Sequence, residues 1–211
     1  MTARLPASPF EPQLPGRSGS RLHWSGLDHD ATALAISHAQ TSSAGPVLVI
    51  TETASAANQL ADAMQFFNPD CQPLRFPDWE VLPYDNFSPH QDLISDRLST
   101  LARLPGLDEG LIITTLSTTL QRLPPRSYID GYSLQLDRNQ AIQLEQLQER
   151  FENAGYRRVE QVLEHGEYAI RGGLVDVFAM GSTVPYRIEL FDDIVESLRS
   201  FDPENQRSTG Q

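Results

Sequence analysis

A chain of 211 residues with 39% hydrophobic content is long enough for one large domain or two small ones with packed cores. Its net charge is −12, all 16 basic residues are arginines, and no lysine is present. This inventory excludes a lysine-dependent phosphate-binding loop and Schiff-base chemistry. It also disfavours tight DNA binding unless arginines gather on one face.

The single cysteine, Cys71, excludes an internal disulfide framework and a cysteine-based zinc site. No stretch approaches the roughly 20 apolar residues that span a bilayer, and no apolar signal-peptide core is present near the N-terminus. We therefore expect a cytoplasmic protein without a membrane partner, in a reducing compartment.

The first half of the chain predicts an α/β domain. Residues 1–20 are rich in Pro, Ser and Gly and predict a flexible leader; residues 21–125 alternate helix and strand, which favours a mainly parallel sheet. The first two expected helices are Asp30–Gln40, capped by Asp28 or Asp30, and Ala54–Phe67. A third helix is expected to be capped by Ser88 and to continue through Leu93, Leu98, Leu101 and Leu104. A fourth is expected over Leu116–Arg122. The expected strands are Val47–Thr51 and Leu111–Thr115, both of the buried type, and Leu74–Phe76.

The second half, residues 126–211, predicts a small α+β domain with an antiparallel sheet. The segment Leu123–Ser127 reads as the linker that precedes it. An amphipathic helix is expected over Asn139–Asn153, with Ile142, Leu144, Leu147 and Phe151 facing inward and Gly155 ending it. Alternating strands are expected at Tyr168–Arg171, Leu174–Phe178, Tyr186–Phe191 and Ile194–Phe201, with turns at Gly172–Gly173, Gly181–Ser182 and Asp192–Asp193.

Several ordered motifs resemble the bacterial transcription-repair coupling factors (Mfd). They are Phe76-Pro-Asp-Trp-Glu-Val-Leu-Pro-Tyr-Asp85, Phe87-Ser-Pro-His-Gln-Asp92, Ala154-Gly-Tyr-Arg-Arg158, Glu164-His-Gly-Glu-Tyr-Ala169, Arg171-Gly172, Met180-Gly-Ser182, Leu190-Phe-Asp-Asp193 and Phe201-Asp-Pro203. The resemblance covers about residues 46–208. It implies similarity to domains 1a and 2 of the excision-repair helicase UvrB: a degenerate helicase-like (RecA-type) domain 1a over 21–125 and a UvrA-binding domain 2 over 126–211.

The resemblance also implies what such a piece does and lacks. In the family, domain 2 binds UvrA, while RNA polymerase, DNA, ATP and magnesium belong to other domains of the full-length translocase. The stretch Ser25–Ala31 has one Gly, no Lys and two Asp where UvrB has its phosphate-binding loop. Between Tyr84 and the next helix there is no room for the DNA-inserting hairpin of UvrB. We therefore expect a monomeric, non-catalytic docking module without a cofactor of its own.

Strand alternation predicts where docking occurs. Tyr186, Ile188 and Leu190 share one side of a strand, and Arg187 and Phe191 share the other. Arg171 points to that second side if the strands belong to one sheet, and an arginine pair beside an exposed aromatic ring is typical of binding hot spots. The positions that match the family's UvrA-contacting residues are Arg171, Arg187 and Phe191. The alternative is a solvated strand face with ion pairs and with the Phe191 ring tucked under a loop.

Other functions receive weaker support from the sequence. The runner-up is an ATP-dependent helicase or a damaged-DNA-binding fragment, and a metal-dependent nuclease built on carboxylates is a distant third. His90 and His165 have no metal-ligand spacing, and Trp79 with nearby prolines and Tyr84 is better explained as an aromatic plug than as a base-stacking platform. The carboxylates on which such a nuclease would rest are Asp176, Glu189, Asp192 and Asp193.

Overall fold

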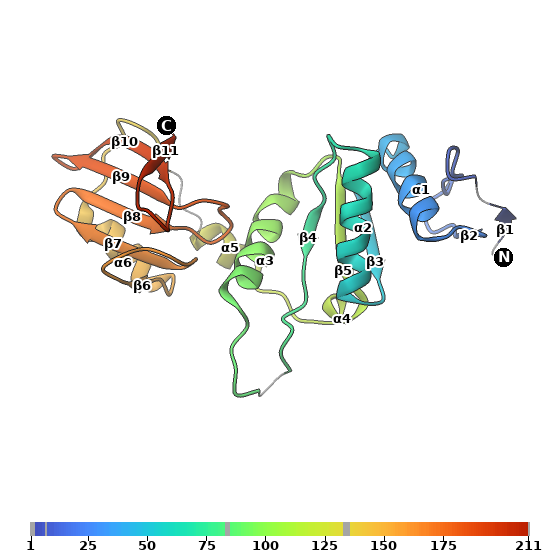
Figure 1. The fold of residues 1–211 in the computed structure, drawn as a ribbon, viewed down its shortest axis with the longest axis horizontal. Helices are drawn as coiled ribbons and strands as arrows, with labels where there is room; N and C mark the ends of the chain where they lie inside the picture. The colour runs from blue at the N-terminus through green and yellow to red at the C-terminus, as the bar shows by residue number, and fades with distance from the viewer. Residues whose placement is uncertain (1–2, 7, 83–84, 133–135, 211) are drawn as a thin grey trace. The chain divides into compact units, whose positions relative to one another are not determined.

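The computed structural model describes residues 3–6, 8–82, 85–132 and 136–210 (Figure 1). The chain forms two compact units: residues up to 78 together with 104–121, and residues 79–103 together with 122–211. The predicted boundary after residue 125 leaves residues 79–103 in the first half, whereas their contacts lie in the second unit. Among the helices described, none is long and apolar enough to cross a bilayer. Pro83 and Tyr84, which the sequence groups with Trp79, lie outside the described residues.

The first unit is built on a parallel three-stranded sheet in the order β3-β5-β4, in which Val49 lies opposite Ile113. Two helices pack on one face of this sheet, where Leu60, Met64 and Leu111 are buried. A further parallel pair, β1 with β2, precedes them. The elements are β1 (Ala3–Pro6), β2 (Leu22–Ser25), α1 (His29–Ser42), β3 (Val47–Thr51), α2 (Ala54–Phe67), β4 (Leu74–Phe76), a 3₁₀ turn (Leu104–Gly106), β5 (Leu111–Thr115) and α4 (Leu116–Thr119).

Side-chain caps start the two long helices of this unit. The Asp28 carboxylate accepts the Ala31 backbone N–H at 2.8 Å, and the Thr53 hydroxyl accepts that of Ala56 at 3.1 Å. Such caps satisfy amide groups that have no partner inside the helix. Of the two predicted candidates, Asp28 and Asp30, the cap is Asp28, and it places a carboxylate at the first turn of α1.

Three predictions for the first unit need correction. Strand β3 is not buried on both faces, because it lies at the edge of a sheet covered on one side; the Leu48 and Ile50 side chains are 54% and 49% exposed. Helix α4 ends at Thr119 and not at Arg122. Part of the predicted leader, residues 3–6, forms a strand.

The second unit is built on a six-stranded mixed sheet in the order β11-β10-β9-β8-β7-β6 (Figure 1). Neighbouring strands are antiparallel except β6 and β7, which are parallel, so the prediction of a purely antiparallel sheet is wrong at this edge. The elements are α3 (Gln91–Arg103), α5 (Arg126–Tyr132), α6 (Leu144–Asn153), β6 (Arg157–Arg158), β7 (Glu167–Arg171), β8 (Leu174–Phe178), β9 (Tyr186–Phe191), β10 (Ile194–Phe201) and β11 (Ser208–Gly210).

Helix α6 covers one face of this sheet. Its Leu147 and Phe151 side chains, four residues apart on one helix face, are buried against Tyr168, Val175 and Ile188 of the strands. The Phe151 and Tyr168 ring centroids are 5.1 Å apart. The opposite face is covered at one end by a smaller cluster of Val162, Ala169, Phe178 and Phe201, which leaves its other end open.

Helix boundaries in the second unit differ from the predictions. Helix α6 begins at Leu144 because the residues before it bridge to β10 through Ala141 and Ile194. Helix α5 begins inside the predicted linker. Helix α3 begins at Gln91, so Ser88 is not its cap; the His90 ring instead accepts the Asp92 backbone N–H at 3.3 Å. The buried side chains of α3 are polar, and they are Ser95, Arg97 and Thr100.

Candidate functional site

The candidate site is the open end of the sheet face opposite α6, here called the docking face and defined by Arg171, Asp176, Arg187, Glu189 and Phe191. Strand register sets its membership, because residues directly opposite each other in neighbouring strands point to the same side. Arg171 lies opposite Leu174, which lies opposite Glu189; Asp176 lies opposite Arg187. Arg187, Glu189 and Phe191 alternate along β9, so all five side chains share one face.

Asp176 joins the two arginines of the docking face. Its side chain is 1% exposed, and Oδ1 accepts from Arg187 Nε at 2.7 Å while Oδ2 accepts from Arg187 Nη2 at 2.9 Å. Arg171 Nη2 donates to the same Oδ2. The hydrogen bonds that Arg187 donates to Asp176 raise the pKa of Arg187 above its ordinary value, and burial opposes this shift without overcoming it. The pair is thus a charge-assisted, two-pronged contact of the strong kind.

Arg187 is further held by Gln206 and by Phe201 of β10. Its Nη1 donates to the Gln206 backbone carbonyl at 3.1 Å, and its guanidinium carbon lies 4.8 Å from the Phe201 ring centroid. The side chain is only 15% exposed. Directly opposite stands Arg199, whose Nη2 lies 3.8 Å from Glu189 Oε2. Arg187 and Arg199 are thus neighbours across the strands, and each lies near a carboxylate, Asp176 and Glu189 respectively.

Phe191 stands at the end of β9 with its ring 67% exposed, so it is not tucked under a loop. Ile194, directly opposite in β10, is 44% exposed. The turn between them uses Asp192 and Asp193 at φ angles of 43° and 62°, the left-handed conformations that tight hairpin turns require. The turn thus projects an apolar pair at the edge of a charged surface.

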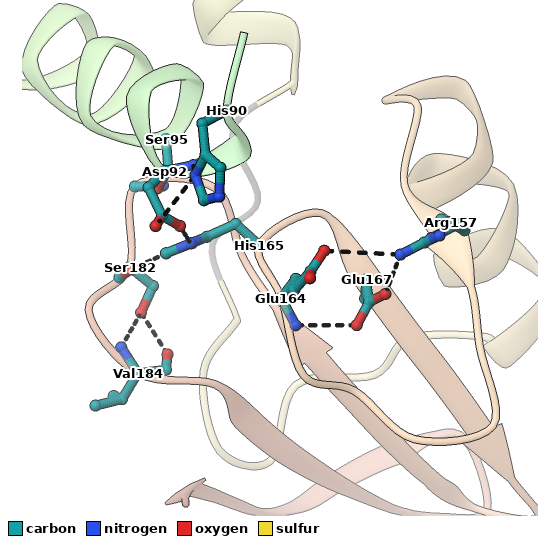
Figure 2. A network of polar contacts seen from close by, with 10 residues as sticks. His90, Asp92, Ser95, Arg157, Glu164, His165, Glu167, Ser182 and Val184 are labelled. Atoms are coloured by element: carbon teal, nitrogen blue, oxygen red, sulfur yellow. Dashed lines mark hydrogen bonds and ion pairs between the residues drawn. The ribbon is translucent and has the colours of Figure 1, made fainter. Parts of the chain in front are cut away.

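A second polar network holds α3 against the turns of the sheet (Figure 2). His165 lies between Asp92 and Ser182: its Nδ1 is 2.8 Å from Asp92 Oδ1, and its Nε2 is 2.8 Å from the Ser182 carbonyl oxygen. Gly181 N donates to Ser95 Oγ at 2.8 Å. His165 was predicted to be isolated from metal-ligating partners, and in the structure it serves as a structural link between segments 73 residues apart in the chain.

Glu167 anchors the same turns from the strand side. Its carboxylate accepts the backbone N–H groups of Leu163 and Glu164 at 2.8 and 2.9 Å and pairs with Arg157 at 2.5 Å (Figure 2). Burial disfavours the charged form, but these hydrogen bonds outweigh it and hold the pKa of Glu167 below its ordinary value. Residues of the motifs 164–169 and 180–182 thus stabilise the packing of the second unit through these hydrogen bonds.

The remaining candidate groups are accounted for locally. In the described parts of the chain, no group of three or more His, Cys, Asp or Glu side chains could hold a metal ion. The Arg97 guanidinium carbon lies 4.0 Å from the Trp79 ring centroid.

The sequence did not identify Asp176 as the link between Arg171 and Arg187. The available signal was the Gly172–Gly173 turn, because this turn sets the register between β7 and β8.

Comparison with known proteins bears on this unit directly. Residues 134–211 match the UvrB interaction domain. The chain is 43% identical over 195 residues to the transcription-repair-coupling factor of Escherichia coli and 40% identical over 199 residues to that of Haemophilus influenzae, which covers 92% and 94% of this chain. The protein of the same name from Mycobacterium bovis is 31% identical over 209 residues. The chain spans 17% of the length of each of these relatives.

Proposed function

The chain is a homologue of the transcription-repair-coupling factors with a UvrB interaction domain, and from this premise we propose that it is a non-catalytic docking module that recruits the excision-repair protein UvrA. Docking uses the second unit, through Arg171, Arg187 and Phe191. The observation that carries the proposal is the exposed Phe191 ring on the same sheet face as an arginine pair, inside the matched residues 134–211. A rigid aromatic ring beside arginine is the composition of interface hot spots.

The first unit has a supporting place in this proposal. We regard it as a helicase-like fold that no longer holds a nucleotide, because Asp28 puts a carboxylate at the first turn of α1 and the chain has no lysine for a triphosphate. RNA polymerase, DNA, ATP and magnesium belong, on this proposal, to other parts of a longer protein.

The test is calorimetric titration of this chain with purified UvrA. We expect binding, and we expect Phe191→Ala to weaken it by about 2 kcal/mol, or roughly 30-fold, because the ring fills an apolar pocket of the partner. The exposed ring leaves few internal contacts to lose, so thermal stability should stay close to that of the parent.

Phe66→Ala is the matched control. Phe66 is a phenylalanine of the first unit that is 79% exposed, and its replacement should leave UvrA affinity unchanged. The proposal is wrong if the parent chain does not bind UvrA, or if the two alanine variants lose the same affinity.

A further inference from the structure

The two arginines of the docking face share one buried carboxylate. Both oxygens of Asp176 are engaged by Arg187, and Oδ2 also receives Arg171 Nη2. Planar guanidinium groups donate in fixed directions, so a buried acceptor orients them strongly. Because Asp176 is 1% exposed, a binding partner on this face meets the arginines and not the carboxylate.

The two arginines differ in what they can offer to a partner. Arg187 is 15% exposed, and each of its three nitrogens already donates, two to Asp176 and one to the Gln206 carbonyl. Arg171 exposes half of its side chain and lies at the end of β7, toward the open end of the face. Arg171 is therefore the arginine with surface left for a contact, and Arg187 is mainly internal.

The charge at this point is unbalanced. Two cations meet one anion at Asp176, while the neighbouring Glu189 is occupied by Ser197 Oγ at 2.5 Å and by Arg199. At Asp176 itself the arginines outnumber the carboxylate, in a chain whose net charge is −12. A partner that fits this end offers a carboxylate to Arg171 and an apolar pocket to the Phe191 ring.

Resting on the proposed function, we propose that Asp176 is the positioning residue of the docking face: it holds Arg171 for direct contact with an acidic group of UvrA and fastens Arg187 as an internal support. The contact residues are then Arg171 and Phe191. Arg187 acts through the arrangement that Asp176 maintains.

A double-mutant cycle in UvrA titrations tests this assignment. Asp176→Asn keeps the size of the side chain but removes its charge, and it should weaken binding by about tenfold, as should Arg171→Ala. In the Arg171→Ala background, Asp176→Asn should weaken binding by less than about threefold, because the group that it positions is gone. The assignment is overturned if the fold-losses of UvrA affinity in the two single variants multiply in the double variant. It is also overturned if the Asp176→Asn variant binds UvrA like the parent.

Glu167→Gln separates positioning from general destabilisation. Glu167 is also a buried carboxylate paired with an arginine in the same sheet, but its partner is Arg157, on β6, outside the docking face. The Glu167→Gln substitution should lower the melting temperature without changing UvrA affinity. An equal loss of affinity in Glu167→Gln and Asp176→Asn would mean that stability alone explains both.

Salt dependence tests the acidic partner group. Raising salt from 50 to 200 mM should weaken binding of the parent by a larger factor than binding of Arg171→Ala, because the ion pair is absent from the variant. The same factor for both proteins contradicts an acidic contact at Arg171.

One measurement needs no UvrA and therefore stays informative if the proposed function fails. In NMR spectra of the free chain labelled on arginine, the Nη groups of Arg171 and Arg187 should rotate slowly in the parent, and those of the exposed Arg158 rapidly. Asp176→Asn should speed up the first two. Rapid rotation at Arg171 in the parent overturns the positioning role, even if the Asp176 variant does not fold.

Discussion

At the scale of single residues, buried carboxylates of the second unit are stabilised by directed donors. Glu167 and Asp176 are both buried, and each is met by an arginine. Burying a charge is costly unless it is paired and hydrogen-bonded, so removing one partner leaves an uncompensated group. These pairs hold the unit together, and at Asp176 the same pairing also sets up the docking face.

Glu167 predicts a specific dependence of stability on pH. Its pKa is lowered in the folded chain, so its contribution is complete above the unfolded pKa of about 4.3 and is lost as pH falls through the folded value. Glu167→Gln should therefore lower the free energy of unfolding clearly at pH 7, and the gap to the parent should narrow at pH 3. Urea denaturation at both pH values measures this.

Glu164→Gln is the control for that series. Glu164 approaches the same Arg157 at 3.8 Å but is 68% exposed, so its replacement should change stability little at either pH. An equal gap between parent and Glu167→Gln at pH 7 and pH 3 would contradict an ionised, hydrogen-bonded Glu167.

At the scale of elements, α3 is held by polar partners that are distant in the sequence. Its buried residues are polar, namely Ser95, Arg97 and Thr100. Two of its polar partners, His165 and Gly181, come from turns 73 and 86 residues further along the chain. Local pattern cannot reveal such partners, whereas it did locate β8, β9 and β10, whose alternation and turn residues are encoded nearby.

His165 should stabilise the attachment of α3 more than its neighbour His90 does. The two ring nitrogens of His165 contact the Asp92 carboxylate and the Ser182 carbonyl, each at 2.8 Å. His165→Ala removes both hydrogen bonds from a side chain that is 15% exposed. We expect a loss of about 1–3 kcal/mol in the free energy of unfolding and faster amide exchange in the first turns of α3.

His90→Ala provides the comparison, since His90 is 74% exposed and lies 3.3 Å from the same Asp92 carboxylate. It should change stability by about 0.5 kcal/mol or less. If hydrogen exchange in α3 responds equally to both variants, His165 does not have the structural role assigned to it.

At the scale of the whole molecule, the sequence predicts local elements and the residues that share a strand face better than it predicts pairing between distant segments. Strand alternation and the resemblance both place Arg171, Arg187 and Phe191 on one sheet face, and the register agrees with that placement. The parallel pairing of β6 with β7 and the grouping of α3 with the second unit depend on contacts between distant segments. The burial of Arg187 depends likewise on Gln206, whose return to β9 no local pattern predicts.

Charge over the whole chain leads to the last prediction, which concerns DNA. Acidic residues outnumber arginines by 28 to 16, and several arginines already face carboxylates. Among the described residues, examples are Arg75, Arg157, Arg171, Arg187 and Arg199. A DNA phosphate would have to displace these partners, and few counterions would be released on binding.

We therefore expect weak binding of duplex or single-stranded DNA, with a shallow dependence of affinity on salt. Fluorescence anisotropy with labelled oligonucleotides at 50 to 200 mM salt measures both, and damaged duplexes belong in the same series. The plot of log affinity against log salt should have a slope smaller in magnitude than about 2, since each neutralised phosphate of B-DNA contributes about 0.9. A slope of 5 or more would mean that arginines gather on a DNA-binding face, which would favour a damaged-DNA-binding fragment over a docking module.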